Sequence, residues 1–196
     1  MTLANKLTLV RLGIAPAAFI CIWAQRPALY ATAFALFLAA TATDWVDGWV
    51  ARRTKSVSPF GVTADPLADK VLVIGALIAF VRIPEIDIPP WAVFFIIVRE
   101  LLIGGLRALA GMQGVLLAAD SGGKFKMVVQ SVSILAILAL LVVWSYGWLA
   151  LPGWTRGIPY HLVVLSMIVS ILSGGHYLYT SRRMLRKSWN APENEK

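Results

Sequence analysis

Four aspartates lie close together in the stretch 44-DWVDGWVARRTKSVSPFGVTADPLADK-70. Asp44 and Asp47 are three residues apart, and Asp65 and Asp69 are four residues apart. Residues at these spacings lie on one face of a helix, so two helical faces would bring four carboxylates together. An unpaired carboxylate at membrane depth is costly, so the cluster needs cations, protons or a wet cavity around it.

Hard divalent cations are the natural counter-charge, because carboxylate oxygens are the preferred ligands of Mg²⁺ and Mn²⁺. The chain has a single cysteine, Cys21, and only two histidines, which excludes a multi-cysteine metal site. Two divalent ions about 3.5–4 Å apart can clamp a pyrophosphate while an oxygen nucleophile attacks it. The acidic cluster therefore predicts a two-metal site for phosphoryl transfer.

Small residues between the acids fit the same interpretation. Gly48 and Ala51 leave room beside the first two aspartates, and Gly61 removes a side chain from the expected loop, so a nucleotide can approach. Each piece alone has a simpler interpretation: Asp65 before Pro66 is typical of a helix N-cap, and Gly48 is typical of helix packing. Capping accounts for one acid and leaves three without partners, which favours the metal site.

The elements that hold these acids are expected to be membrane helices. Of 196 residues, 59% are apolar and 14% are charged, against roughly 45–50% and 25% in soluble domains. Apolar runs between Pro, Gly and charge clusters predict six helices, at residues 6–24, 28–53, 64–82, 90–111, 123–148 and 159–185. We expect an all-α integral membrane bundle of six transmembrane helices, with one domain at residues 1–189 and a disordered polar tail at 190–196.

The net charge of +8 does not indicate a nucleic-acid partner. Most basic residues lie beside apolar runs, where they set topology and contact lipid headgroups. The first helix is expected to be retained, because no small-residue cleavage site follows it. The distribution of Lys and Arg predicts that both termini and the acidic cluster face the cytoplasm.

The spacing D-x2-D-G-x2-A-R-x8-G-x3-D-x3-D is met without departure, and it resembles the CDP-alcohol phosphatidyltransferase family. The matching residues are Asp44, Asp47, Gly48, Ala51, Arg52, Gly61, Asp65 and Asp69. The resemblance implies a six-helix membrane enzyme, commonly a homodimer, that transfers a phosphatidyl group from a CDP-linked donor to an alcohol and releases CMP.

The resemblance also implies a role for each motif residue. Asp44, Asp47 and Asp65 would bind two Mg²⁺ or Mn²⁺ ions, and Asp69 would be a further ligand or the general base on the acceptor hydroxyl. A carboxylate bound to a divalent ion has a depressed proton affinity, so the base role requires Asp69 to stay free of full coordination. The CDP site would be lined by Gly48, Ala51, Arg52 and Gly61, with Thr8 as a further contact.

Segments outside the motif, at residues 5–11, 99–114, 122–126 and 172–179, resemble the members of the family that act on CDP-diacylglycerol and glycerol 3-phosphate, the phosphatidylglycerophosphate synthases. Arg107, Lys124 and Lys126 are expected near the cytoplasmic ends of two helices, where they can bind a dianionic phosphate. They can equally orient these helices or contact lipid headgroups.

Two features within helices have a structural interpretation. Arg99 and Glu100 lie deeper in an apolar run, where an internal ion pair or hydrogen-bond network is expected to hold that helix. Ser166, Ser170 and Gly174 form a small-residue stripe that allows close helix contact, either within a subunit or across a dimer.

Several alternatives remain open at this point. The acceptor can be inositol phosphate, serine or a phospholipid instead of glycerol 3-phosphate. A cation- or proton-coupled transporter can also use clustered aspartates, but transporter sites lie near the bilayer midplane, whereas these acids flank a basic loop. A non-catalytic scaffold leaves the acids without a purpose. A bacterial cytoplasmic membrane is the expected location, with a mitochondrial membrane as the alternative.

Overall fold

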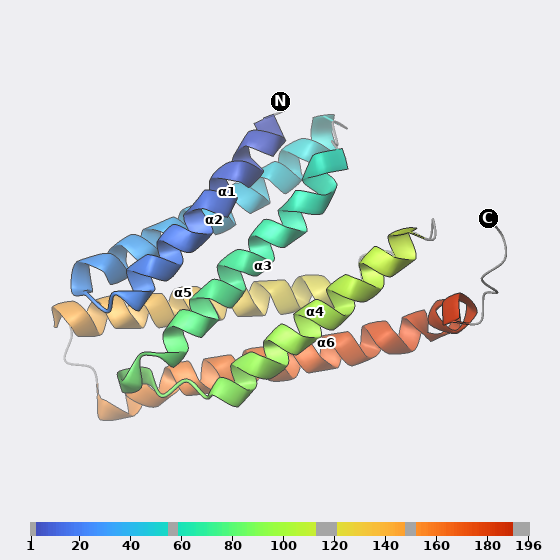
Figure 1. The fold of residues 1–196 in the computed structure, drawn as a ribbon. Helices are drawn as coiled ribbons and strands as arrows, with labels where there is room; N and C mark the ends of the chain where they lie inside the picture. Colours follow the sequence, from blue (N-terminus) through green and yellow to red (C-terminus); the bar gives the residue numbers. More distant parts are fainter. Residues whose placement is uncertain (1–2, 55–58, 113–120, 148–151, 190–196) are drawn as a thin grey trace.

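The computed structural model of the chain is a bundle of helices in the residues that it describes (Figure 1). These are residues 3–54, 59–112, 121–147 and 152–189, with side chains described at 8–43, 67–111, 122–147 and 152–182. The α-helices are α1 (Leu3–Trp23), α2 (Pro27–Thr54), α3 (Pro59–Val81), α4 (Pro90–Met112), α5 (Ser121–Tyr146) and α6 (Ile158–Trp189). Two short 3-10 helices, η1 (Pro84–Ile86) and η2 (Gly153–Gly157), precede α4 and α6.

Proline opens three of these helices. Pro27, Pro59 and Pro90 are the first residues of α2, α3 and α4. Proline is tolerated at this position because its missing N–H would have no partner within the helix. Within the described residues, the predicted number and order of the α-helices are confirmed. The third helix is predicted from residue 64 but begins at Pro59, because this proline starts a helix instead of interrupting the chain before one.

The helices pack in two groups, α1 to α3 and α4 with α6, which α5 joins. α1 packs along both α2 and α3, α5 packs against α2 and α6, and α4 lies mainly on α6. In Figure 1, α5 runs between the group of α1 to α3 and the pair formed by α4 and α6. The described contacts between α3 and α4 are few, so polar links between these two helices matter for the site.

The two ends of the bundle differ in what they bury. Fully buried apolar side chains gather where α1 and α3 end and α2 begins, and they include Ile22, Phe37 and Phe80. Toward the other end, many of the buried side chains are polar or charged, among them Thr8, Arg11, Glu100 and Lys126. The end that carries the acidic motif therefore has a polar interior.

The outer surface is apolar where the interior is charged. Leu101 and Leu172 are 65% and 67% exposed, whereas Arg11 is 1% exposed. Exposed large apolar side chains around buried charges are unusual in a soluble protein and indicate an apolar surrounding at this end. Within the described residues, Gly122–Tyr146 and Gly153–Arg182 are long and apolar enough to cross a membrane. The crossing by all six helices stays a prediction.

Candidate active site

The acidic motif occupies the last turns of α2 and the first turns of α3. Both helices are continuous through the motif, so Asp44 and Asp47 share one helical face, and Asp65 and Asp69 share another. The short connection between the helices reaches at most about 17 Å even when fully extended. The backbone therefore keeps both acidic faces at the same end of the bundle (Figure 1).

Two local expectations for this segment are wrong. Gly61 is expected in a loop, but it lies in the first turn of α3. Asp65 lies well inside α3, so it is not the N-cap of that helix. Both differences follow from the start of the helix at Pro59. Capping therefore accounts for none of the four aspartates, since the other three also lie within helices.

Most side chains of the motif lie outside the described residues. They are those of Asp44, Asp47, Gly48, Ala51, Arg52, Gly61 and Asp65. Among the side chains that are described, no three from His, Cys, Asp and Glu group together as metal ligands would, and Asp69 is the only member of the acidic cluster in that set. The metal site stays a prediction. The donor set fits it, because four carboxylates at two joined helix ends are the oxygen ligands that Mg²⁺ and Mn²⁺ prefer.

Asp69 forms an ion pair with Arg11 of α1. The Arg11 NH1 group donates to Asp69 Oδ1 at 3.2 Å, and the two side chains are 1% and 26% exposed. Thr8 lies one turn earlier on α1 and is also buried, so α1 presents a hydroxyl and a guanidinium to the interior beside α3. The role of Thr8 in CDP binding stays a prediction. Arg11 supplies a fixed counter-charge to Asp69.

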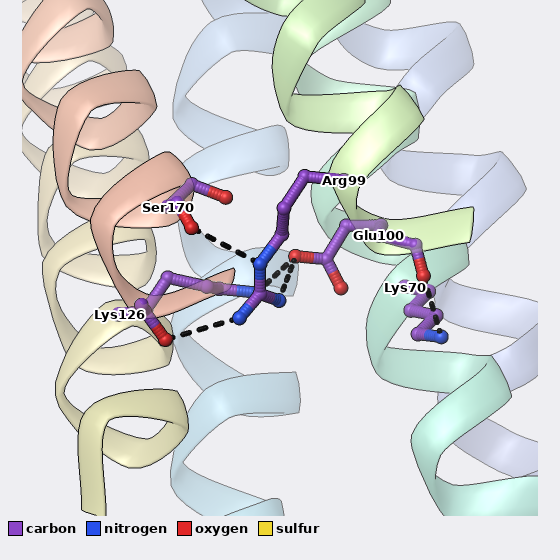
Figure 2. Close-up of polar contacts among 6 residues, drawn as sticks. Lys70, Arg99, Glu100, Lys126 and Ser170 are labelled. Atoms are coloured by element: carbon purple, nitrogen blue, oxygen red, sulfur yellow. Dashed lines mark hydrogen bonds and ion pairs between the residues drawn. The ribbon is translucent and has the colours of Figure 1, made fainter. Parts of the chain in front are cut away.

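A buried charge network, termed the Glu100 network, joins α3, α4, α5 and α6 (Figure 2). Its members are Lys70, Arg99, Glu100, Lys126, Ser170 and Ser173. Glu100 Oε1 accepts hydrogen bonds from Arg99 NH1 at 3.1 Å and from Lys126 Nζ. The three charged side chains are at most 12% exposed. The prediction of an internal network around Arg99 and Glu100 is confirmed.

Arg99 fastens α4 to α6. Its Nε donates to the Ser170 backbone carbonyl at 3.1 Å, and its NH2 group donates to Ser173 Oγ at 3.0 Å. Gly174 makes this approach possible, because a Cβ at that position would lie 3.0 Å from Arg99 Cγ. The Arg99 side chain thus lies against a place on α6 where a larger residue would force it to shift.

The small-residue stripe of α6 makes its described contacts within the chain. Ser166 Oγ donates to Ser133 Oγ of α5 at 3.0 Å. Ser170 and Gly174, the other two members, face Arg99 of α4. Of the two alternatives left open by the sequence, the structure therefore shows contact within a subunit.

Lys70 links the acidic motif to the Glu100 network. Its Nζ donates to the backbone carbonyl of Glu100 at 3.2 Å. Gly104, one turn further along α4, leaves space for the ammonium, because a Cβ there would overlap Lys70 Nζ. Since Lys70 directly follows Asp69, the Arg11 ion pair and the Glu100 network adjoin each other on α3.

The Glu100 network carries more positive than negative charge. Arg99 and Lys126 contact the Glu100 carboxylate, and Lys70 contacts the Glu100 backbone carbonyl. These four charged side chains therefore carry two positive charges in excess. Buried charge without full compensation costs free energy. The network itself, apart from the aspartates of the acidic motif at the same end of the bundle, therefore favours an anionic ligand.

The cations predicted for the acceptor phosphate lie at the same end but in two environments. Arg107 is exposed, with its guanidinium carbon 5.1 Å from the centre of the Tyr177 ring. Its NH2 atom is 3.8 Å from the place that a Cβ on Gly123 would occupy. Lys124, the next residue in the first turn of α5, is also exposed. Lys126 is buried within the Glu100 network. The exposed pair can meet a ligand, while Lys126 already has an internal partner.

A cavity of about 740 Å³ lies at the opposite end of the bundle, and its lining includes Gln25, Tyr30, Glu85, Trp144 and Arg156. It contains none of the predicted site residues. The polar interior around Arg11 and Glu100 is therefore the better candidate for the chemistry.

Sequence reasoning missed three members of the site. The sequence patterns give no individual role to Arg11, Lys70 or Ser173. A charged residue on an apolar helix is a signal, because it needs a partner inside the bundle. The identity of the partner depends on how α1 packs on α3 and α4 packs on α6, which local spacing does not contain.

Comparison with known proteins covers most of the chain. The CDP-alcohol phosphatidyltransferase family model matches residues 1–174. The CDP-diacylglycerol–glycerol-3-phosphate 3-phosphatidyltransferase of Bacillus subtilis is 38% identical in an alignment of 149 residues that covers 69% of this chain and 76% of that protein. The protein of the same name from Cereibacter sphaeroides is 36% identical over 143 residues, covering 71% of this chain and 63% of that protein.

A third relative is the probable phosphatidylglycerophosphate synthase of Mycobacterium tuberculosis, 38% identical over 135 residues, which are 67% of this chain and 63% of that protein. The chain thus spans a little less than two thirds of the length of the latter two relatives. Because the family match runs from the first residue to Gly174 of α6 and includes every position of the acidic motif, the chain belongs to the CDP-alcohol phosphatidyltransferase family of enzymes.

Proposed function

We propose that the chain transfers the phosphatidyl group from CDP-diacylglycerol to sn-glycerol 3-phosphate, releasing CMP and forming phosphatidylglycerol phosphate. The observation that carries this proposal is the excess of positive charge that the side chains of the Glu100 network bring together from α3, α4 and α5. Arg107 and Lys124 stand exposed beside it. A dianionic phosphate needs several such donors, whereas serine does not. The names of the relatives from Bacillus subtilis and Cereibacter sphaeroides agree with this acceptor.

The acidic motif would hold the donor. Two Mg²⁺ or Mn²⁺ ions would be bound by Asp44, Asp47 and Asp65, with Asp69 as a further ligand unless it acts as the general base. When bound, these ions neutralise the negative charge of the CDP-diacylglycerol pyrophosphate. The residues proposed to line the CDP site are Thr8, Gly48, Ala51, Arg52 and Gly61.

The acceptor would approach from the α4 and α5 side. Arg107, Lys124 and Lys126 would provide the positive charge for its phosphate. Its hydroxyl oxygen forms the new bond to the phosphorus that carries diacylglycerol, and the bond from that phosphorus to the CMP oxygen breaks. Asp69, oriented by Arg11, would accept the hydroxyl proton if it is not fully engaged as a ligand.

The same proposal includes the setting of the enzyme. Residues 1–189 would form one catalytic domain whose six helices cross a bacterial cytoplasmic membrane, with the active site and both termini on the cytoplasmic side. Exposed apolar side chains on α4 and α6 support contact with membrane lipids. A homodimer, which the family resemblance implies, is part of this proposal.

The test is a competition between acceptors. The protein purified in detergent is supplied with Mg²⁺, radiolabelled CDP-diacylglycerol and either glycerol 3-phosphate, inositol phosphate, serine or a phospholipid. We expect CMP release and a labelled phosphatidylglycerol phosphate only with glycerol 3-phosphate. Labelled product from another acceptor, with none from glycerol 3-phosphate, would show that the acceptor assignment is wrong.

A further inference from the structure

We propose that Glu100 is a positioning residue for the acceptor site, which holds Lys126 and Arg99 in place without contacting the substrate. This inference rests on the proposed function, because it concerns the site of the acceptor phosphate. A carboxylate does not itself attract a phosphate, so any effect of Glu100 on acceptor binding passes through the cations that it holds.

The contacts of Glu100 reach three helices at once. Its Oε1 accepts from Arg99 NH1 at 3.1 Å and from Lys126 Nζ, so a single oxygen sets the places of a guanidinium on α4 and an ammonium on α5. Its backbone carbonyl accepts from Lys70 Nζ of α3 at 3.2 Å. No other described residue contacts all three cations.

Burial makes these cations depend on the carboxylate. The side chains of Lys126 and Arg99 are 9% and 12% exposed, and that of Glu100 is 8% exposed. Without the carboxylate, three like charges would remain in a weakly screening interior, where their repulsion is stronger than in water. Lys126 and Arg99 would then move apart, and the positive charge would lose its fixed geometry.

Glu100 also sets the charge of the site. With its carboxylate, the network has two positive charges in excess, which matches the charge of about −1.5 to −2 on a phosphate monoester at neutral pH. Replacing the carboxylate by an amide of the same size would raise the excess by one and release Lys126. The positioning role therefore predicts an effect on the phosphorylated acceptor and none on the CDP-linked donor.

The experiment measures both Michaelis constants for Glu100→Gln in the CMP-release assay. We expect the KM for glycerol 3-phosphate to rise by about tenfold or more while the KM for CDP-diacylglycerol and kcat change by less than about threefold, since only acceptor binding is weakened. In the double variant Glu100→Gln with Lys126→Met, the KM for glycerol 3-phosphate should be close to that of Lys126→Met alone, because the two residues act as one unit. Glu100→Asp, which keeps the charge on a shorter stem, should recover part of the affinity for glycerol 3-phosphate.

The matched control is Glu85→Gln. Glu85 is exposed on η1 at the opposite end of the bundle, so both Michaelis constants should stay at the wild-type values. Three results would overturn the positioning role alone. The first is an unchanged or lowered KM for glycerol 3-phosphate in Glu100→Gln, and the second is an equal rise in KM for both substrates. The third is a double variant whose loss of affinity for glycerol 3-phosphate equals the sum of the losses in the two single variants. A wild-type protein without CMP release that depends on glycerol 3-phosphate would instead overturn the proposed function and this inference with it.

Discussion

Arg11 and Lys126 are buried and Arg99 is largely buried, and each contacts a carboxylate. Arg107 and Lys124 are exposed, and no ion pair with an acid is found for either among the described residues. Removing one partner from a buried pair costs about 3–5 kcal/mol, whereas an exposed cation contributes little to stability. The buried cations therefore hold helices together, which in the proposal above also fixes the charge of Lys126 and Arg99 at the acceptor site. The exposed cations are directly available to a ligand.

Substitution of the motif aspartates is expected to remove activity while the protein stays folded. Asp44→Asn, Asp47→Asn and Asp65→Asn should each lower CMP release by about 10²–10³-fold, the loss that follows removal of one electrostatic contact in an active site. Chelation of divalent ions from the wild-type enzyme should abolish release, and Mg²⁺ or Mn²⁺ should restore it. The measurement is CMP release together with Mn²⁺ binding followed by electron paramagnetic resonance.

Asp87→Asn is the matched control for these substitutions. Asp87 is exposed beside η1 with a φ of 43°, a left-handed conformation that asparagine also tolerates, so activity and Mn²⁺ binding should stay unchanged. Near-normal CMP release by any of the three motif variants would contradict the assignment of that residue as a metal ligand.

At the scale of elements, alanine substitutions at two adjacent glycines of α6 distinguish the effect of packing on stability from the effect of helix propensity. A Cβ at Gly174 would meet Arg99 Cγ at 3.0 Å and Nε at 3.2 Å, whereas a Cβ at Gly175 would have nothing within 4 Å. Gly174→Ala should therefore displace Arg99 from the Ser170 carbonyl and lower the free energy of unfolding by about 1–3 kcal/mol. Gly175→Ala should be neutral or stabilise by up to about 1 kcal/mol, because alanine favours a helix.

Thermal unfolding of both variants in detergent tests this difference. Gly174→Ala should melt below the wild type, and Gly175→Ala at or above it. Equal melting temperatures for the two variants would show that the contact between Arg99 and α6 does not stabilise the bundle.

How far the sequence predicts each feature depends on the range of the interactions involved. The helices and the acidic motif follow from apolar runs and from spacings within one turn, so both are readable in one sequence. The start of α3 is misplaced because Pro59 can either break a helix or begin one, and only the fold decides. The pair of Arg11 and Asp69 joins residues 58 positions apart, so it becomes visible only when α1 lies on α3.

The whole molecule has a charged interior at one end, an apolar interior at the other, and an apolar outer surface between them. Charged groups inside a membrane are energetically costly unless they face one another or water. The Glu100 network and the Arg11 pair meet this condition by facing inward from α1, α3, α4 and α5. Under the proposed function, the polar end would hold the charged groups of the substrates while the acyl chains stay in the surrounding lipid.

α6 allows the orientation of the whole molecule to be tested. Arg156 lies on η2 just before this helix, and Arg182 lies near its other end; both are exposed. The helix between them is about 37 Å long, which exceeds the roughly 30 Å of the bilayer hydrocarbon.

In a Cys21→Ala background, a membrane-impermeant maleimide should label Arg156→Cys in intact spheroplasts and Arg182→Cys only after the membrane is opened. The background without an added cysteine should stay unlabelled, and labelling of both positions from the same side would contradict a crossing by α6. Since Tyr177 and the neighbouring Arg107 lie at the Arg182 end, labelling of Arg182→Cys from the inside would also assign the acceptor site to the cytoplasmic face.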